Sequence, residues 1–289
     1  MQTRWAIFLV LPAILGFFLW QVGPMIANFV ISFTDWEVGS SPQFIGFSNY
    51  KELFFDDFIF KKSMGVTFYF AIGSVIASGI SAFIVALLLN QQIKFKSIFR
   101  ALYFLPAIIP LVASSTVWMW LFNPNFGLLN YTLGLLGLPG SEWIYGEATA
   151  VPSLILMSVW SMGQTMIIFL AGLQGIPRQL YEAVEIDGGG WWARFAHVTI
   201  PMMTPTLFFH IVMGLIGSFQ AFVQPYLMTQ GGPNYQTMFA VYYIYNNAFF
   251  YQRMGYASAI ATILFLIILV FTLLVFGTSS RWVYYEANK

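Results

Sequence analysis

Amide and aromatic side chains inside two apolar stretches could recognise a ligand rich in hydroxyl groups. Trp160 and Gln164 lie one helical turn apart, and in the next apolar stretch Gln220 and Gln224 align with Gly217. Amides can donate hydrogen bonds to hydroxyls and accept them, and an aromatic ring can stack on the apolar face of a sugar ring. This pattern predicts a path for an uncharged, sugar-like solute. The alternative is that the amides join neighbouring helices while the aromatic rings face lipid.

Three further side chains are candidates, two for the same path and one for proton transfer. Trp120 and Asn123, near the outer end of another apolar stretch, could also contact the solute. The predicted membrane spans contain no Asp, Glu, Lys or Arg, which leaves His210 as the candidate for a proton relay. The alternative for His210 is a neutral imidazole that is hydrogen-bonded within the helix bundle.

Several other chemistries lack the residues that they need. The chain has no Cys, so the sequence predicts no thiol nucleophile, disulfide or Cys-based metal site. The ATP-binding motif G-x-x-x-x-G-K-[ST] is absent, and Trp191 follows the glycines at 188–190 where such a loop would need Lys. A net charge of +1 argues against nucleic acid as a partner. We therefore expect no catalytic residue, no metal and no cofactor bound by this chain.

The composition is that of a membrane protein. Hydrophobic residues make up 59% of the 289 residues and charged residues 8%, whereas soluble domains carry roughly 25% charged residues. Apolar runs of about 20 residues, the length that crosses a bilayer, recur along the chain. We expect an all-α, multi-pass protein in contact with lipid, whose residues 1–289 form one transmembrane domain. The six predicted spans are residues 5–33, 66–89, 101–122, 151–173, 202–228 and 256–277.

The distribution of Lys and Arg predicts how these spans are oriented, because cytoplasmic loops carry an excess of both residues. With the N-terminus inside, the cytoplasmic segments hold eight of them and the outer segments four. The eight are Arg4, Lys94, Lys96, Arg100, Arg178, Arg194, Arg281 and Lys289, and the four are Lys51, Lys61, Lys62 and Arg253. We therefore expect both termini and the loop at 175–205 in the cytoplasm, and the protein in the plasma or inner membrane of the cell.

The loop at 175–205 is the longest charged interruption between two apolar stretches. Pro177 suits the first turn of a helix, which can continue over 178–187 until Gly188 supplies a left-handed end residue. The glycines at 188–190 permit a sharp turn, and 191–199 can form a second short helix that ends near Pro201. Two short helices at an angle would make a protruding element suited to docking a partner.

The residues of this loop resemble those of a known family. The pattern EAxxxDG, followed by a spaced aromatic and I-P-x-x-x-P, is carried by Glu182, Ala183, Asp187, Gly188, Phe195, Ile200, Pro201 and Pro205. It resembles the cytoplasmic loop of the membrane permease subunits of binding-protein-dependent ABC importers. The resemblance implies that 177–200 is a coupling loop seated in an ATPase subunit through Tyr181, Glu182, Ala183, Val184, Asp187 and Gly188. Two departures are Val184 in place of a usual Ala, and Gly189-Gly190 in place of a more usual Gly-Ala pair.

Further stretches resemble the carbohydrate-uptake class of these permeases, the maltose and glycerol-phosphate type. They are FIGFSNYKELFF at 44–55, LFNPNFGLLN at 121–130, MTQGGPNYQTMFAVYYIYNNAF at 228–249 and GYASAIA at 255–261. The resemblance implies the type I importer permease fold and an ATP-driven import path for a sugar or oligosaccharide. It also implies that this subunit is not itself an enzyme.

The same resemblance implies a set of partners. They are a second, similar permease in a heterodimer, two cytoplasmic ATPase subunits that hold ATP and Mg, and an extracytoplasmic solute-binding protein. Two alternatives stay open. One is the same architecture for glycerol phosphate or another polyol, and the other is a secondary transporter or facilitator that works without an ATPase and could use His210.

Overall fold

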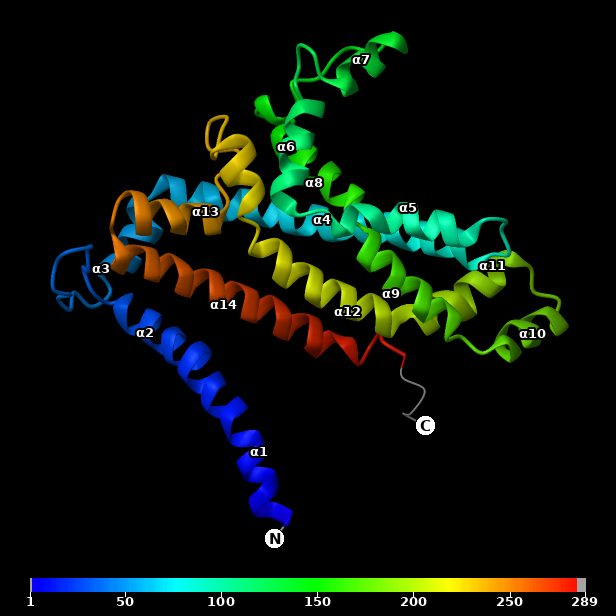
Figure 1. The fold of residues 1–289 in the computed structure, drawn as a ribbon, viewed down its shortest axis with the longest axis horizontal. Coiled ribbons are helices and arrows are strands. Elements are labelled where there is room, and N and C mark those ends of the chain that lie inside the picture. The colour runs from blue at the N-terminus through cyan, green and yellow to red at the C-terminus, as the bar shows by residue number, and fades with distance from the viewer. Residues whose placement is uncertain (1, 285–289) are drawn as a thin grey trace. The chain divides into compact units, whose positions relative to one another are not determined.

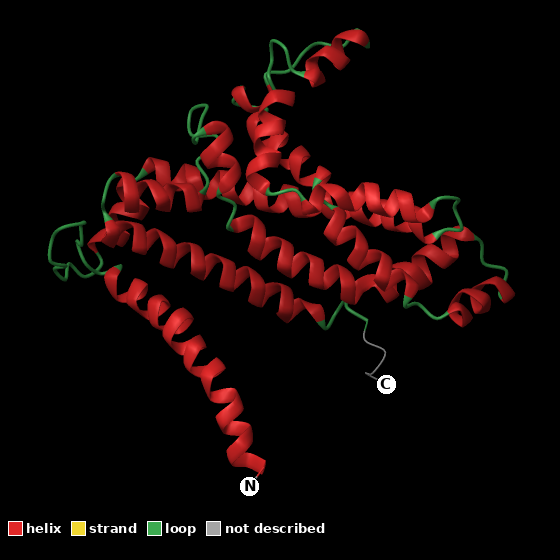
Figure 2. Ribbon diagram, in the orientation of Figure 1, coloured by secondary structure: helices red, strands yellow, loops and turns green. Residues whose placement is uncertain are grey.

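The computed structural model describes residues 2–284, with side chains from residue 9 onward. Helices and the loops between them make up this part of the chain (Figure 1, Figure 2). Its one β-type pairing, within these described residues, is an isolated bridge between Thr34 and Phe44. The predicted all-α fold is therefore confirmed. Lys289 and the Arg4 side chain, which entered the prediction of orientation, lie outside the described residues.

The chain divides into two compact units. The first comprises Met1–Lys61 and Ala240–Leu266, and the second comprises Lys62–Phe239 and Ile267–Lys289. Helices α4 (Phe58–Asn90) and α14 (Met254–Ser279) each contribute residues to both units. A single transmembrane domain over 1–289 stays a prediction, because a division into packed units does not test it.

In the first unit, the loop after the N-terminal helices is held by a buried amide. Asn49 donates from Nδ2 to the carbonyl oxygens of Ser32 (2.9 Å) and Thr34 (2.8 Å). Gly255, at the start of α14, approaches the Thr34 carbonyl so closely that no side chain would fit there. The other elements of this unit are α1 (Gln2–Phe17), a π-helical turn (Phe18–Val22), α2 (Gly23–Ile31), α3 (Ser48–Lys51), a π-helical turn (Glu52–Asp56), α13 (Ala240–Tyr245) and a π-helical turn (Asn246–Phe250).

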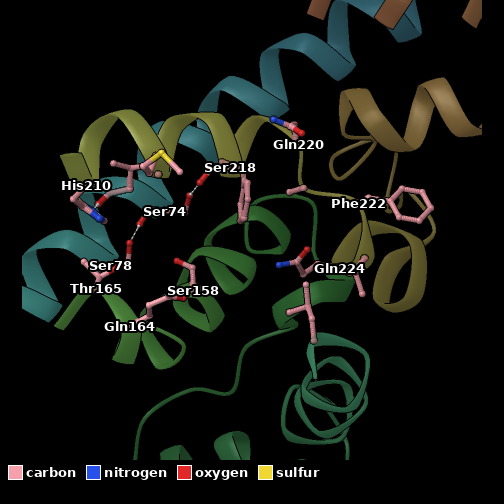
Figure 3. A pocket seen from close by; sticks show the side chains of 18 of the residues that line it. Ser74, Ser78, Ser158, Gln164, Thr165, His210, Ser218, Gln220, Phe222 and Gln224 are labelled. Carbon is pink, nitrogen blue, oxygen red and sulfur yellow. Dashed lines mark hydrogen bonds between the residues drawn. The ribbon is translucent and has the colours of Figure 1, made fainter. Parts of the chain in front are cut away.

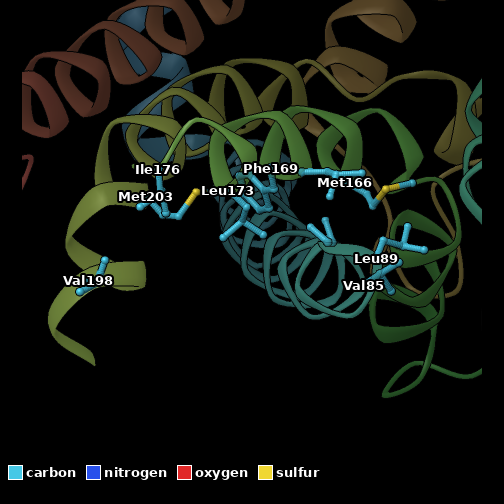
Figure 4. Packing of buried hydrophobic residues seen from close by; sticks show 11 residues of the cluster. Val85, Leu89, Met166, Phe169, Leu173, Ile176, Val198 and Met203 are labelled. Carbon is cyan, nitrogen blue, oxygen red and sulfur yellow. The ribbon is translucent and has the colours of Figure 1, made fainter. Parts of the chain in front are cut away.

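The second unit contains most of the remaining helices, and two hydrophobic clusters hold it together. One cluster joins α4 to α9 and to the start of α12, and it includes Leu89, Phe169 and Met203 (Figure 4). The other joins the end of α6 to α8 through Phe122, Trp118 and Met157. The elements are α5 (Lys96–Ile108), α6 (Leu111–Leu121), α7 (Leu128–Leu135), a 3-10 turn (Trp143–Tyr145), α8 (Ala150–Trp160), α9 (Gly163–Gln174), α10 (Arg178–Ile186), α11 (Trp191–Arg194), a π-helical turn (Phe195–Thr199), α12 (Ile200–Phe219) and a π-helical turn (Pro225–Thr229).

Four helices in the described part of the chain are long and apolar enough to cross a membrane: Leu9–Ile31, Phe58–Asn90, Trp191–Phe219 and Met254–Ser279. Two bent pairs, α5 with α6 (98°) and α8 with α9 (51°), bring the total to six if each pair is one span. The break between α5 and α6 falls at Pro110. Proline has no N–H to continue a helix and keeps the preceding residue extended, so Ile109 has ψ 128°.

The helix that contains most of the predicted span at 202–228 has different ends. It begins at Trp191, inside the loop at 175–205, and ends at Phe219. Gln220 leaves the helical conformation with ψ 13°, and Pro225 has no N–H to donate to the carbonyl of Ala221. A new helical turn starts only at residue 223 and leads into Pro225–Thr229. The chain therefore makes a short break at 220–222, although it stays apolar through Met228.

Candidate functional site

A cavity of about 610 Å³ lies in the second unit, between α4, the α8–α9 pair and α12 (Figure 3). α4 contributes Ser74 and Ser78, and α12 contributes His210 and Ser218. Gln220 comes from the break after α12, and Gln224 comes from the helical turn that follows it. On the opposite side Ser158, Gln164 and Thr165 complete the polar part of the wall. Apolar side chains such as Phe70, Phe209 and Phe222 line the rest.

The polar groups of this wall are uncharged. Among the described residues that line the cavity there is no Asp, Glu, Lys or Arg, and His210 is the one ionisable side chain. Hydroxyl and amide groups can exchange hydrogen bonds with a neutral polar ligand but cannot neutralise an ionic one. No three His, Asp or Glu side chains in the described part of the chain are placed to hold a metal ion.

The structure brings the three predicted glutamines together at this cavity, but not on the helical faces that the sequence suggested. Gln220 follows the last residue of α12, whereas Gln224 belongs to the next helical turn, so the expected alignment of both with Gly217 on one helix is wrong. Gln164 lies in the first turn of α9, beyond the 51° bend that separates α9 from α8. Their contact with a solute stays a prediction.

Three other predicted path residues lie away from the cavity wall. Trp160 packs against Trp118 in an edge-to-face arrangement, with ring centroids 5.9 Å apart. Trp120 lines a different hollow, beside Tyr131. The Oδ1 of Asn123 accepts the backbone N–H of Asn125 at 3.0 Å and so stabilises the turn after α6. A local structural role therefore accounts for the contacts of Trp160 and Asn123.

His210 is held between helices. Its Nε2–H donates to the carbonyl oxygen of Val75 on α4 at 3.1 Å, and its ring meets Phe169 edge to face at 5.3 Å. Gly79 makes room for the ring, because a Cβ at this position would lie 2.6 Å from Nε2. Since a carbonyl can only accept, the proton must sit on Nε2. These contacts fit the alternative reading of His210 as a hydrogen-bonded imidazole.

The sequence analysis missed the hydroxyl groups of the wall. Ser74 Oγ donates to Ser218 Oγ at 3.0 Å and thereby joins α4 to α12 beside the cavity. Ser74 and Ser78 share one face of α4 at a spacing of four residues, which was the available signal. Serine is common at helix contacts in membranes, so this spacing did not distinguish a lining residue from a packing one.

The loop at 175–205 forms the predicted pair of short helices. α10 starts after Pro177 and ends at Ile186, and Gly188 has φ +79°, as expected for the left-handed residue that closes a helix. The N–H of Gly189 donates back to the carbonyl oxygen of Val184 at 2.8 Å. An ion pair between Glu185 and Arg194 joins α10 to α11 across the turn.

The second of these helices does not end near Pro201. α11 continues through a π-helical turn into α12, so Trp191–Phe219 is one continuous helical segment. In the π turn the N–H of Ile200 donates to the carbonyl oxygen of Phe195, five residues back. This wider turn lets the chain pass Pro201, which has no N–H, without ending the helix. The loop is therefore continuous with α12.

The two faces of α10 differ. Tyr181 and Val184 pack against the cluster of α4 and α9, and the Tyr181 hydroxyl hydrogen-bonds Thr199 Oγ1 at 3.1 Å. The opposite face is exposed and holds Glu182, Ala183 and Asp187, followed by Gly188. It also includes Ile186, with 86% of its surface exposed, which the sequence analysis did not single out. The predicted docking residues thus divide into an anchoring pair and an exposed set.

Comparisons with known proteins show which family and which relatives this chain resembles over most of its length. A family model described as "Binding-protein-dependent transport system inner membrane component" matches residues 74–283. The chain is 38% identical over 283 residues to the Probable ABC transporter permease protein YesP of Bacillus subtilis. This alignment covers 96% of this chain and 91% of YesP. It is 30% identical over 267 residues to the Arabinooligosaccharides transport system permease protein AraP of the same species, covering 91% of this chain and 84% of AraP.

A solved structure shares the fold. It is a chain of a bacterial alginate ABC transporter, crystallised in complex with alginate pentasaccharide-bound periplasmic protein. The TM-score is 0.85, and the match covers 97% of this chain and 96% of that chain at 23% sequence identity. At this level of identity the likeness concerns the fold alone.

Proposed function

This chain belongs to the family of binding-protein-dependent transport system inner membrane components, and we propose that it forms the import path for a neutral sugar or oligosaccharide. The recognition made from its sequence is confirmed, as is the type I importer permease fold. It is a multi-pass membrane protein and a relative of ABC transporter permease subunits.

The observation that carries the proposed substrate class is the uncharged polar wall of the cavity. Gln164, Gln220 and Gln224 offer amide groups, and serine hydroxyls surround them, among apolar side chains. This mixture suits sugar hydroxyls and the apolar faces of sugar rings. The relative AraP, named for arabinooligosaccharides, supports the same class. A phosphorylated polyol would favour a cation, and no Lys or Arg occurs among the described lining residues.

We further propose that the exposed face of α10 docks into an ATPase subunit. Glu182, Ala183 and Asp187 are accessible there, while Tyr181 and Val184 fasten the same helix to the core. A pull on α10 reaches α11 through the Glu185–Arg194 ion pair and the turn at 188–190. Because α11 and α12 are continuous, the pull then moves the wall of the cavity that holds His210 and Ser218.

The proposal includes the partners and orientation that the sequence predicts. These are a second permease in a heterodimer, two ATPase subunits that hold ATP and Mg, a solute-binding protein outside, and both termini in the cytoplasm. The family description supports the binding protein, and the names of the relatives support an ABC transporter. A facilitator that depends on His210 is disfavoured, because the Nε2 of His210 already donates a hydrogen bond to the carbonyl of Val75.

The experiment that tests the proposal is purification of the complex through this chain in mild detergent, followed by reconstitution with its solute-binding protein. We expect an ATPase subunit to co-purify, and radiolabelled uptake of one of maltose, trehalose or an arabino-oligosaccharide to require ATP. Recovery of the chain alone, with uptake that continues without ATP, would overturn the importer proposal. Uptake restricted to glycerol phosphate would overturn the neutral-sugar part.

A further inference from the structure

Gln224 differs from the other polar residues of the cavity wall. Its Oε1 is buried and has no hydrogen-bond partner. In the part of the chain that the structure describes, the other two buried side-chain atoms in this condition belong to Ser63 and Arg100, and neither lines the cavity. Buried polar atoms are nearly always paired, so an unpaired one at a binding cavity calls for a physical reason.

Other groups of the wall have already formed bonds within the protein. Ser78 Oγ donates to the carbonyl of Ser74 at 2.6 Å, and Ser158 Oγ donates to that of Ile155 at 2.6 Å. Gln220 Nε2 donates to the carbonyl of Ile216 at 3.0 Å. These three donors are paired within the protein. The Gln224 oxygen is not, and this conformation carries the cost of its desolvation.

The backbone that carries Gln224 is held in place. Pro225 follows it and is buried, and the rings of Phe222 and Tyr226 stack with centroids 5.1 Å apart. The N–H of Tyr226 donates to the carbonyl of Phe222 at 3.0 Å across the same turn. Figure 3 shows the Gln224 amide directed into the cavity, on the side of Ser158 and Gln164. The amide is thus aimed by a fixed turn.

We infer that Gln224 Oε1 is a specificity-determining acceptor for a hydroxyl of the transported saccharide, and that the bond forms when the cavity walls separate around it. The inference rests on the proposed function, since it assigns a role to one residue of that path. Because the oxygen is covered here, a hydroxyl reaches it only in a more open state. A bond made in one state alone shifts the population toward that state.

The test compares Gln224→Met with Gln220→Met in the complete importer complex. Methionine keeps the length of glutamine and removes the amide. Gln224→Met deletes an unpaired buried oxygen, so we expect the thermal midpoint to rise by about 2 °C or more. We expect the KM for saccharide uptake to rise about five-fold, with the KM for ATP unchanged. Gln220→Met deletes a bonded donor, so no rise in midpoint is expected.

The outcomes are separable. An unchanged KM for saccharide in Gln224→Met, whatever its thermal midpoint, would overturn the inference, because it would mean that the oxygen never contacts the solute. A lower midpoint would also overturn it, because the oxygen would then have a structural partner. Failure of the proposed function looks different, since the unmodified complex would then show no ATP-dependent uptake of maltose, trehalose or arabino-oligosaccharide.

Discussion

Val184 fills the space beside Gly189 in the loop at 175–205. Its Cγ1 lies 2.5 Å from the point where a Cβ on Gly189 would stand, and its carbonyl oxygen lies 2.8 Å from that point. The sequence analysis noted Val184 and Gly189-Gly190 as two separate departures from the family pattern. In the structure Val184 packs against Gly189, where this chain keeps the glycine of the usual pair, and its side chain and carbonyl together leave no room for a side chain at 189. Gly190 faces open space.

We predict that Gly189→Ala disturbs the turn between α10 and α11. The added methyl group must displace the rigid Val184 side chain and its carbonyl, at a cost of about 1–3 kcal/mol. Less ATPase subunit should then co-purify with the chain at an equal level of the chain in the membrane. The recovered ATPase can be quantified by immunoblot against the chain itself.

Gly190→Ala is the matched control, since nothing lies within 4 Å of its added Cβ and its φ of −77° suits alanine. It should leave recovery of the ATPase unchanged. Combining Val184→Ala with Gly189→Ala removes the contact with Cγ1 but not the contact with the carbonyl, so recovery should be partial. Equal effects of the two alanine substitutions would contradict this account of the turn.

Reversal of charge at Glu182 should uncouple ATP hydrolysis from uptake. Glu182 is exposed on the face of α10 that we propose contacts the ATPase. Glu182→Lys should lower ATP-dependent uptake about ten-fold or more while the chain stays in the membrane, because a misplaced charge in an interface costs several kcal/mol. Gln174→Lys, exposed at the end of α9 and outside the proposed docking face of α10, is the control. Normal transport by Glu182→Lys would remove the docking role.

The positions of the helices could be predicted from sequence because apolar runs of bilayer length are visible without any tertiary contact. Their ends could not. Hydropathy stays high through Met228, but α12 stops at Phe219 because of backbone hydrogen bonding near Pro225. The expected helix end near Pro201 failed for a similar reason. Hydropathy and the proline suggested that a helix ends there, but a π turn carries the helix past Pro201.

The candidate site was predicted by residue type rather than by geometry. Gln164, Gln220 and Gln224 all line the cavity. They could be singled out from the sequence because amides are uncommon in apolar stretches and therefore point to a function. Trp160 was assigned to the same stripe as Gln164 on the assumption of a straight helix. The 51° bend between α8 and α9 separates them, and Trp160 packs against Trp118 instead. That bend depends on packing between helices, which no local pattern reports.

Gly79→Ala should displace His210. The Cβ of the new alanine would lie 2.6 Å from His210 Nε2, so the imidazole would lose its hydrogen bond to the Val75 carbonyl. We expect the complex to lose about 1–3 kcal/mol of stability, read as a lower thermal midpoint in detergent. Gly65→Ala, on the same helix with nothing within 4 Å, should have little effect. Uptake driven by a pH gradient without ATP would instead assign His210 to proton transfer, and we expect none.

The buried Tyr243 and the half-buried Asp57 form a hydrogen-bonded pair outside the helices that are long enough to span. The Tyr243 hydroxyl donates to Asp57 Oδ2 at 2.6 Å, and Asp57 Oδ1 accepts the backbone N–H of Phe60 at 2.8 Å. Burial first, and then the hydrogen bond and charge of Asp57, raise the pKa of Tyr243 above its usual value of 10.0. The hydroxyl therefore keeps its proton in the folded protein at a pH where it would lose it in an unfolded chain.

This pair predicts a loss of stability at alkaline pH. Because the folded-state pKa is raised, the contribution of Tyr243 is fully present below about pH 10 and is lost as the pH rises further. Tyr243→Phe should cost about 1.5–3 kcal/mol at neutral pH, the value of a hydrogen bond to a charged group, and should flatten the decline above pH 10. The measurement is the thermal midpoint from pH 7 to 11, with the exposed Tyr251→Phe as control. Parallel curves for Tyr243→Phe and the unmodified protein would mean that Asp57 does not hold this hydroxyl.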